Sequence, residues 1–122
     1  MNKTKGVGFC MANIKGFKFF DFDSTNEISN ILTNPSRGES LTIEVNDNGT
    51  GIGLSLVVQG KSDLQDEENW FNIAAISLAD YSISPKIEKA GLYVIPLDGI
   101  VKCRMVSENG VGGFKVYSLT IR

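Results

Sequence analysis

The sequence predicts an all-β fold: an antiparallel β-sandwich, Ig-like or jelly-roll-like, with an N-terminal arm. Short apolar stretches with a period of two recur about every 10 residues, as the strands of such folds do. Turn dipeptides of the Asn-Gly and Asp-Gly kind separate these stretches, and the chain has 13 glycines but only 3 prolines. No long stretch shows the period of a helix, so many short strands joined by tight turns are expected.

The chain has the size of one domain, and its 122 residues divide into two parts. Residues 1–16 are rich in Lys and Gly and have no sustained period, so we predict an N-terminal arm that a partner would order. Residues 17–122 are predicted to form the β-sandwich domain.

The first half of this domain contains three candidate strands. Residues 17–22 include phenylalanines on both alternating faces, which predicts a strand covered on two sides. The stretch Ile28–Leu32 fits either an edge strand or a helical turn. Between residues 41 and 46, apolar and polar side chains alternate as they do in a half-buried strand.

The second half continues the pattern. Residues 70–75 and 76–81 are predicted to be extended, although residues 73–79 also fit a short helix. Apolar side chains alternate again over residues 93–97. Pro96 cannot donate a backbone hydrogen bond, so it predicts an edge position or the end of that strand.

Two hairpins are predicted from the turn signals. Asn48-Gly49 lies between two alternating stretches and predicts a hairpin over residues 41–58. Asn109-Gly110 and Gly112-Gly113 predict a second hairpin over residues 101–121. These glycine clusters lack the lysine of a phosphate-binding loop and precede strands, so we interpret them as turns.

The composition argues against catalysis. The chain has no histidine, which removes the Ser-His and Cys-His pairs of nucleophilic enzymes and the commonest general base. Asp63, Asp66, Glu67 and Glu68 crowd one polar segment, whereas the two carboxylates of a glycosidase flank the bond that they cleave. We therefore predict a protein that is not an enzyme.

The same acidic segment is the candidate for a metal, because calcium prefers several carboxylate oxygens. It lacks the alternating acidic spacing and the central glycine of a known calcium loop, so we prefer a solvated loop and predict no metal and no cofactor. Cys10 and Cys103 fit neither a metal-ligand spacing nor a disulfide framework. Two free thiols in a reducing cytoplasm are expected.

Charge and hydropathy limit the partners. The 12 basic and 14 acidic residues give a net charge of -2, so we expect no general attraction to nucleic acid or to an anionic membrane. No apolar run reaches the ~18 residues of a membrane span, and no signal peptide is expected at the N-terminus.

Trp70 and Phe71, followed by Tyr81, form the main aromatic group. Large aromatic side chains commonly anchor sandwich cores, so Trp70 is predicted to lie in the core. The alternative is an exposed platform on which a sugar ring stacks, which would make the protein a carbohydrate- or surface-binding module of a tail or fibre.

A broader pattern runs through the C-terminal two-thirds of the chain. An apolar strand ends in glycine, and an acidic loop and a Trp precede a Gly-x-Tyr strand, an Arg-bearing strand and a glycine turn. The residues are Leu54 to Gly60, Asp63, Trp70, Gly91-Leu92-Tyr93, Leu97-Asp98-Gly99, Val101 to Arg104, Ser107 and Gly110 to Ile121. In this order they resemble the small β-sandwich virion proteins of tailed bacteriophages, of the capsid-decoration or head-fibre type.

The resemblance implies a structural protein of the virion, made in the host cytoplasm, that decorates or stabilises the capsid through protein–protein contacts. It implies the major capsid protein or another virion protein as partner, a homo-oligomer on the particle, and neither nucleic acid nor membrane.

The arm is the predicted docking element, because it carries apolar side chains that a purely solvated tail does not need. The predicted partner-binding residues are Lys3, Lys5, Val7, Phe9, Met11, Ile14 and Lys15. The alternative is that Phe9 and Ile14 belong to the core of the domain, in a first strand.

Overall fold

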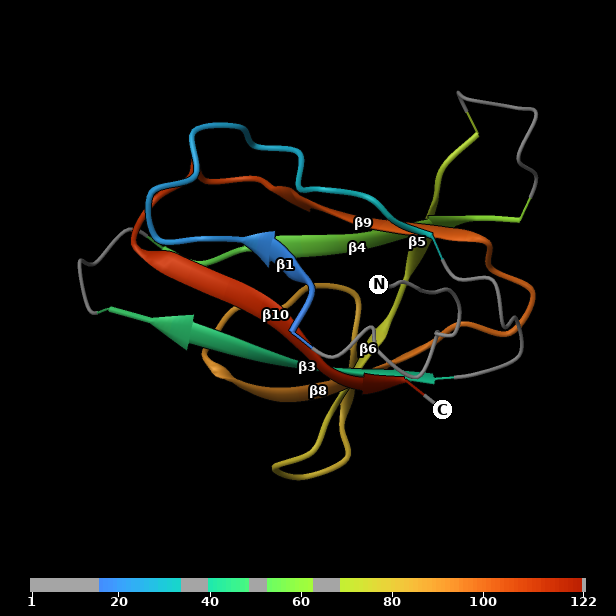
Figure 1. Ribbon diagram of the computed structural model, residues 1–122. Coiled ribbons are helices and arrows are strands. Elements are labelled where there is room, and N and C mark those ends of the chain that lie inside the picture. The colour runs from blue at the N-terminus through green and yellow to red at the C-terminus, as the bar shows by residue number, and fades with distance from the viewer. Residues whose placement is uncertain (1–15, 34–39, 49–52, 63–68, 122) are drawn as a thin grey trace, which may run out of the picture.

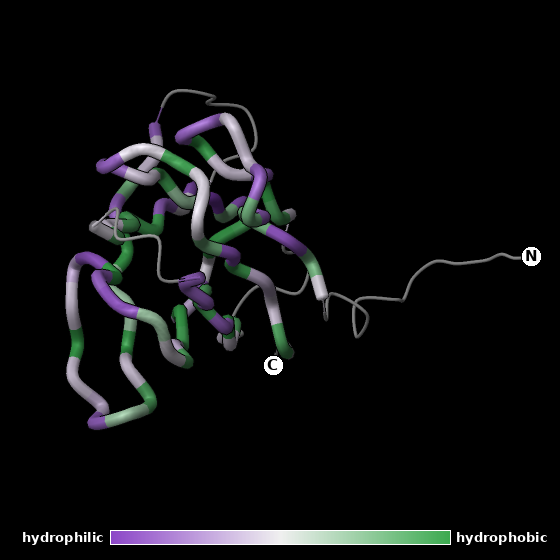
Figure 2. Tube along the Cα trace, turned by 90° about the vertical axis from the view of Figure 1, so that its left-hand side faces the viewer, coloured by the Kyte–Doolittle hydropathy of each residue, from purple (hydrophilic) through white to green (hydrophobic). Residues whose placement is uncertain are grey.

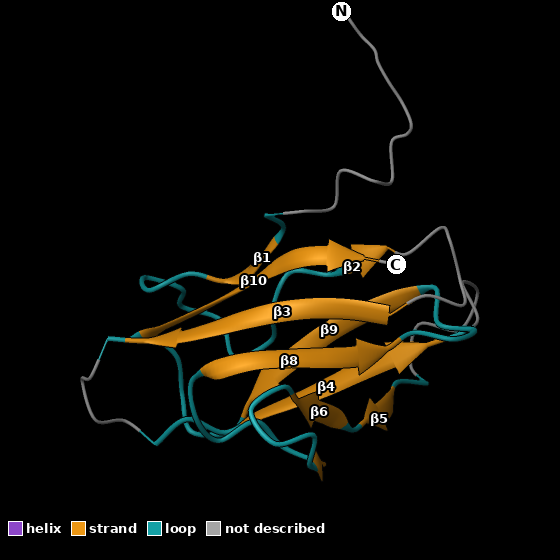
Figure 3. Ribbon diagram, turned by 90° about the horizontal axis from the view of Figure 1, so that it is seen from below, coloured by secondary structure: helices purple, strands orange, loops and turns teal. Residues whose placement is uncertain are grey.

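The computed structural model describes residues 16–33, 40–48, 53–62 and 69–121, which form two antiparallel sheets and no helix (Figure 3). The six-stranded sheet contains, in spatial order, β1 (Lys18–Phe20), β10 (Phe114–Ile121), β3 (Ser40–Asp47), β8 (Gly91–Pro96), β6 (Ala75–Ser77) and β7 (Ile83–Ser84). The four-stranded sheet contains β2 (Leu32–Thr33), β9 (Lys102–Ser107), β4 (Leu56–Lys61) and β5 (Phe71–Ile73). The predicted all-β sandwich is confirmed.

The strand pairing selects the jelly roll over the immunoglobulin-like alternative. First and last strands pair in a nested series: β1 with β10, β2 with β9, β3 with β8, and β4 with β5. The chain therefore follows the path of one long hairpin that is rolled up, so that its strands distribute between two facing sheets. β10, β3 and β8 lie side by side in front of β9 and β4 (Figure 3).

Both hairpins that we predicted from turn dipeptides are wrong. β3 lies in the six-stranded sheet and β4 in the four-stranded sheet, so residues 41–58 cross between sheets. Residues 101–121 do the same, because β9 pairs with β4 and β2 while β10 pairs with β3 and β1. A turn dipeptide reverses the chain but does not decide whether the next strand pairs beside the last one or crosses to the opposite sheet.

The glycine turn itself is as predicted. Gly110, Gly112 and Gly113 have φ values of 96°, 96° and 84°, in the left-handed region that glycine enters without steric cost. The Ser107 hydroxyl donates a hydrogen bond to the Gly110 carbonyl. The left-handed glycines and this hydrogen bond together hold the connection between β9 and β10 in a tight reversal.

The core forms where the inward faces of the two sheets meet. Leu41, Ile43 and Val45 of β3 are buried, as the alternation predicts, and their polar neighbours face outward. The same alternation of apolar and polar residues is visible along the strands in Figure 2. The remaining core positions include Leu56 and Val58 of β4, and Cys103 and Met105 of β9.

Three smaller predictions have clear outcomes. The aromatic strand β1 buries both Phe19 and Phe20 in the one core, where its register with β10 shifts, and Phe20 packs edge-on against Phe114 with ring centroids 5.1 Å apart. Residues 28–32 lie at a sheet edge, since β2 is the outermost strand of its sheet. Pro96 ends β8 and does not mark a sheet edge, because β8 lies between β3 and β6.

The hairpin of β6 and β7 is additional to the rolled series. It extends the six-stranded sheet beyond β8, and the segment that follows β6 protrudes from the two sheets at the bottom of Figure 1. Residues 71–73 and 75–77 are extended, as predicted, and the alternative of a short helix over residues 73–79 does not hold, because residues 75–77 pair with β8 and β7. Among the described residues there is no helix long and apolar enough to cross a membrane.

Candidate functional site

Neither of two segments singled out in the sequence can be placed. The arm residues Lys3, Lys5, Val7, Phe9, Met11, Ile14 and Lys15 lie outside the described residues, as does the acidic segment 63–68. Docking by the arm and the interpretation of the acidic segment as a solvated loop therefore stay predictions.

The described part of the chain offers a candidate site at the β6–β7 hairpin. The hairpin turn is closed by a hydrogen bond from Ser77 N to the Ser82 carbonyl (2.9 Å) and by another from Tyr81 N to the Ser77 carbonyl (2.7 Å). Tyr81 occupies the left-handed region with a φ of 60°, which is costly for a bulky side chain. Its ring is 75% exposed, so no packing in the described structure offsets this strain.

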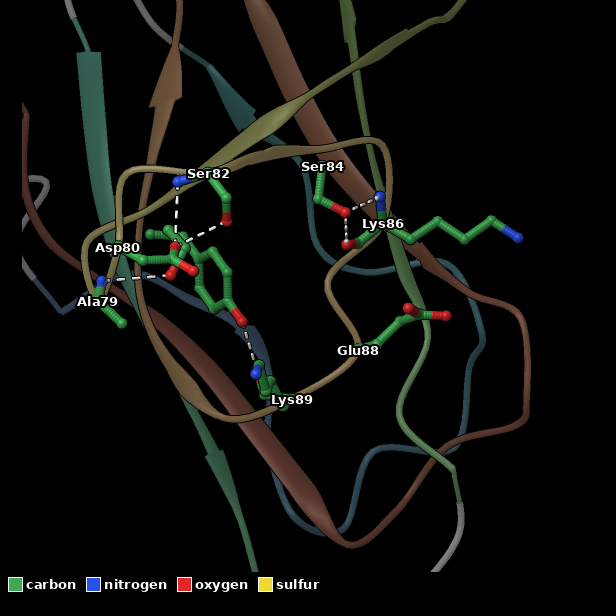
Figure 4. Close-up of a pocket in the computed structure, with 9 residues that line it drawn as sticks. Ala79, Asp80, Ser82, Ser84, Lys86, Glu88 and Lys89 are labelled. Carbon is green, nitrogen blue, oxygen red and sulfur yellow. Dashed lines mark hydrogen bonds between the residues drawn. The ribbon is translucent and has the colours of Figure 1, made fainter.

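A cavity of about 330 Å³ lies at this hairpin. We call it the hairpin cavity; its lining residues are Ser77, Ala79, Asp80, Ser82, Ser84, Lys86, Glu88, Lys89 and Tyr93. Asp80 and Ser82 lie on one side, and Glu88 and Lys89 on the other (Figure 4). The cavity thus presents both signs of charge together with hydroxyl groups, which suits a ligand that is bound by hydrogen bonds.

Asp80 organises the first wall. One of its carboxylate oxygens accepts hydrogen bonds from the Ser82 hydroxyl (2.7 Å) and from Ser82 N (3.0 Å). These two bonds, and then the positive charge of Lys89, hold the pKa of Asp80 below its usual value. Asp80 is therefore ionised at neutral pH and gives the cavity a fixed negative charge.

Tyr93 forms the floor, and its phenol is held by the main chain. Its hydroxyl donates a 2.6 Å hydrogen bond to the Lys89 carbonyl. Burial, and secondarily the charge of Asp80, raises the pKa of Tyr93. The phenol therefore stays protonated over the physiological range and acts here as a hydrogen-bond donor.

The opposite wall is tied to neighbouring elements. The Ser84 hydroxyl donates to the Lys86 carbonyl at 2.8 Å, which fixes the bend after β7. Lys86 Nζ lies 2.8 Å from Glu108 Oε1, on the connection from β9 to β10, and its side chain points away from the cavity (Figure 4). This hydrogen bond lowers the pKa of Glu108 and raises that of Lys86.

An apolar surface lies on the other side of the same hairpin. Ile83 of β7 is paired with Ile76 of β6, which is paired with Val94 of β8. Tyr93 and Ile95 point into the core, so Val94 and its neighbour Leu92 face outward. We call Ile76, Ile83, Leu92 and Val94 the outer apolar row. Ile83 is 70% exposed and Leu92 42%, so part of this row is open to solvent.

The groups that the hairpin presents are hydroxyls, carboxylates and ammonium groups. The described residues contain no group of three His, Cys, Asp or Glu side chains that could hold a metal ion. The hydroxyls of Ser82 and Ser84 donate to Asp80 and to a backbone carbonyl, and neither has a neutral nitrogen base beside it. What the hairpin does offer is an apolar surface beside a charged cavity.

The prediction that Trp70 lies in the core is wrong. Trp70 is half-buried and lies outside the core cluster, just before β5. The guanidinium carbon of Arg104 lies 4.1 Å from its ring centroid and Lys61 Nζ lies 5.7 Å away, in cation–π geometry. The pairing of β4 with β5 explains this, because it turns residue 72 and hence residue 70 outward. Arg104 lies over the half-buried ring, and the alternative of a sugar platform stays a prediction.

The sequence reading did not single out the hairpin as a site. Two of its turn residues, Asp80 and Tyr81, lie in the stretch predicted as extended from 76 to 81. The usable signal was Asp80, because a short acidic side chain followed two residues later by serine favours a local turn.

Comparisons with known proteins bear on the fold. No family model and no curated protein sequence matches the chain. Its structure is similar to the crystal structure of the SPBc2 prophage-derived protein YomS, with a TM-score of 0.72 and 11% sequence identity. The likeness covers 88% of this chain and 92% of that one. At this identity the two proteins share a fold, and the likeness by itself carries no function.

Proposed function

We propose that this protein is a non-enzymatic structural protein of a phage particle, which decorates or stabilises the capsid by binding the major capsid protein or another virion protein. The observation that carries the proposal is the β6–β7 hairpin. It is not needed to close the rolled series of strands, yet it carries the exposed side chains Tyr81 and Ile83. Exposed apolar groups next to one another favour a protein interface.

The energetics of this surface point the same way. An exposed aliphatic side chain such as that of Ile83 forgoes about 1.5–3 kcal/mol of hydrophobic stabilisation. The strained φ of the exposed Tyr81 adds a further cost to the hairpin. A hairpin shaped only for stability would place a glycine or asparagine at the turn and polar residues beside it. Burial of both side chains by a partner would recover the hydrophobic part of this free energy and offset the strain.

The phage setting rests on three supports. The chain resembles small virion β-sandwich proteins in its sequence pattern, and it shares its fold with a prophage-derived protein. Jelly rolls are common in viral capsid proteins, although the same fold serves lectins and other proteins. The predicted homo-oligomer and the arm would both act on the particle, and the arm would add contacts to those of the hairpin.

The test uses particles of the phage that encodes the gene. Mass spectrometry of purified particles should detect the protein together with the head proteins. Purified protein should also co-sediment with heads that lack it, and Ile83→Thr should weaken this binding about tenfold or more, because one buried aliphatic side chain is worth that much. Threonine keeps the β-branched shape that suits β7.

The matched control is Ile31→Thr, which removes another exposed isoleucine, from the loop before β2. This variant should bind heads as the wild type does, and both variants should show the same thermal unfolding as the wild type. If the protein is absent from purified particles and does not co-sediment with heads, the proposal is wrong.

The hairpin cavity favours one second candidate, a carbohydrate-binding module. The exposed ring of Tyr81 is next in sequence to Asp80, whose carboxylate lines the cavity with the Ser82 hydroxyl, and sugars are bound by such combinations of aromatic and polar groups. Titration with cell-wall glycan fragments, followed by NMR, should then shift the resonances of these residues. If they do not move, this candidate is excluded for the fragments used.

A further inference from the structure

A hydrogen-bonded series crosses the outer face of the four-stranded sheet, on the side of the molecule away from the core. Arg104 Nε donates to Gln59 Oε1 at 2.9 Å, and Gln59 Nε2 donates to Asn72 Oδ1 at 3.2 Å. These three residues are register partners on β9, β4 and β5, so their side chains emerge in one line. Gln59 uses only the Nε group of Arg104, and it holds the guanidinium over the ring of Trp70.

Lys61 follows Gln59 on the same face of β4. The register that pairs Gly60 with Phe71 brings Lys61 opposite Trp70, and the two are in cation–π contact. Lys61 is only 1% exposed, yet its Nζ has no hydrogen-bond partner within the residues that the structure describes. An ammonium group donates three hydrogen bonds, and a buried one that makes none is among the costliest groups a protein contains.

The surroundings of Lys61 increase this cost. Arg104 places a second positive charge against the same ring, and burial lowers the pKa of Arg104. Within the described ranges no carboxylate forms an ion pair with Lys61 or Arg104; the ion pairs Lys18–Asp21 and Lys86–Glu108 lie elsewhere. Two cations at one aromatic ring repel each other, and an anion that contacts either of them would offset part of this cost.

We propose that Lys61, Arg104 and Trp70 form a binding site for an oxyanion, the phosphate or carboxylate group of an external ligand, on the outer face of the four-stranded sheet. Lys61 supplies a point charge with unused donors, and Arg104 supplies the terminal nitrogens that Gln59 leaves free. Trp70 holds both cations in place. The site does not depend on the hairpin or on the proposed role in a virion.

Trp70 is the single tryptophan of the chain, so its fluorescence reports on this site directly. The full-length protein is titrated in separate experiments with inorganic phosphate and with tri-glutamate, against potassium chloride and tri-glutamine at equal ionic strength. Phosphate or tri-glutamate should change the Trp70 emission in a saturable way, and the chloride and tri-glutamine controls should not. A response to phosphate alone identifies a phosphate site, and a response to tri-glutamate alone identifies a site for acidic peptides.

Substitutions tie the response to the two cations. Lys61→Met and Arg104→Gln should each weaken the binding about tenfold or more, because each removes a charge-assisted hydrogen bond. Lys115→Met is the matched control. Lys115 also lies against an aromatic ring, that of Tyr117 at 5.0 Å, but on β10 in the other sheet, so its loss should leave the binding unchanged. Circular dichroism and thermal unfolding check that each variant is folded.

Two results would overturn the proposal. The first is a wild-type emission that neither phosphate nor tri-glutamate changes saturably, or a change that Lys61→Met retains in full. The second concerns the acidic residues Asp63, Asp66, Glu67 and Glu68. If phosphate binds only after these four are changed to their amides, the chain's own carboxylates supply the anion and the site takes no external ligand.

Discussion

Ile87 and Leu56 exchange two backbone hydrogen bonds of 2.9 Å each, although Ile87 follows β7 of the six-stranded sheet and Leu56 begins β4 of the four-stranded sheet. Both side chains are buried in the core. The segment that forms the far wall of the hairpin cavity is thus attached to the opposite sheet. A loop that would otherwise be free to move is fixed at its middle, and the cavity keeps its shape.

Ile87→Ala should therefore destabilise the whole domain and not only the loop. Truncation of a fully buried isoleucine leaves a cavity in the core, so the free energy of unfolding should fall by about 2–5 kcal/mol. Chemical denaturation measures this change. Leu92→Ala is the control on the neighbouring strand, because its side chain is partly exposed and its loss should cost under about 1 kcal/mol. Equal losses of stability in the two variants would show that Ile87 does not attach this loop to the core.

Tyr81→Gly should weaken binding to phage heads without lowering the stability of the domain. Glycine adopts the left-handed conformation of residue 81 without strain, so the free energy of unfolding should stay the same or rise by up to about 1 kcal/mol. Binding to phage heads should fall, because the exposed ring is lost. Tyr81→Phe keeps both the ring and the strain and should match the wild type in both measurements. A glycine variant that is clearly less stable would mean that the ring packs against the domain in solution.

The pKa of Asp80 should depend on Ser82. The hydroxyl of Ser82 is the largest cause of the lowered pKa, so Ser82→Ala should raise the pKa of Asp80 toward the usual value of an aspartate. Because the folded-state pKa is lowered, the stabilisation from this contact is present above the unfolded-state pKa and is lost as the pH falls through the folded-state pKa.

An NMR titration of the Asp80 carboxyl carbon gives the pKa of Asp80 in the wild type and in Ser82→Ala. Ser84→Ala is the control, because that hydroxyl bonds to the Lys86 backbone and not to Asp80. An Asp80 pKa that Ser82→Ala leaves unchanged would contradict this assignment.

The sequence predicts which residues are buried wherever the alternation of side chains alone decides it. Leu41, Ile43 and Val45 alternate with polar residues, and such a strand has only one face that it can bury, so its core residues follow from the period. The fold class follows from many such strands.

Strand pairing was not predictable in the same way. Asn48-Gly49 and Asn109-Gly110 looked like hairpin turns, but in a jelly roll consecutive strands often cross between sheets, and the partner of β3 is distant β10. Trp70 was misassigned for the same reason. Which face of β5 it occupies depends on its register with β4, across a loop whose length the alternation does not constrain. The hairpin cavity depends on the pairing of β6 with β7 and with β8, which the alternation over residues 76–81 does not reveal.

Cys103 should be chemically silent in the folded protein. Its thiol is fully buried on the inward face of β9, and burial raises its pKa to about 12. Because the thiolate is the reactive form, a thiol reagent at mildly alkaline pH should not modify it until the domain unfolds. Cys10 is the other cysteine of the chain, so the measurement uses Cys10→Ser, which leaves Cys103 as the single thiol. The modification rate should then rise with denaturant in step with the loss of β-structure. Rapid modification under native conditions would show that β9 opens locally, and that the central pairing of β9 with β4 is weaker than its burial implies.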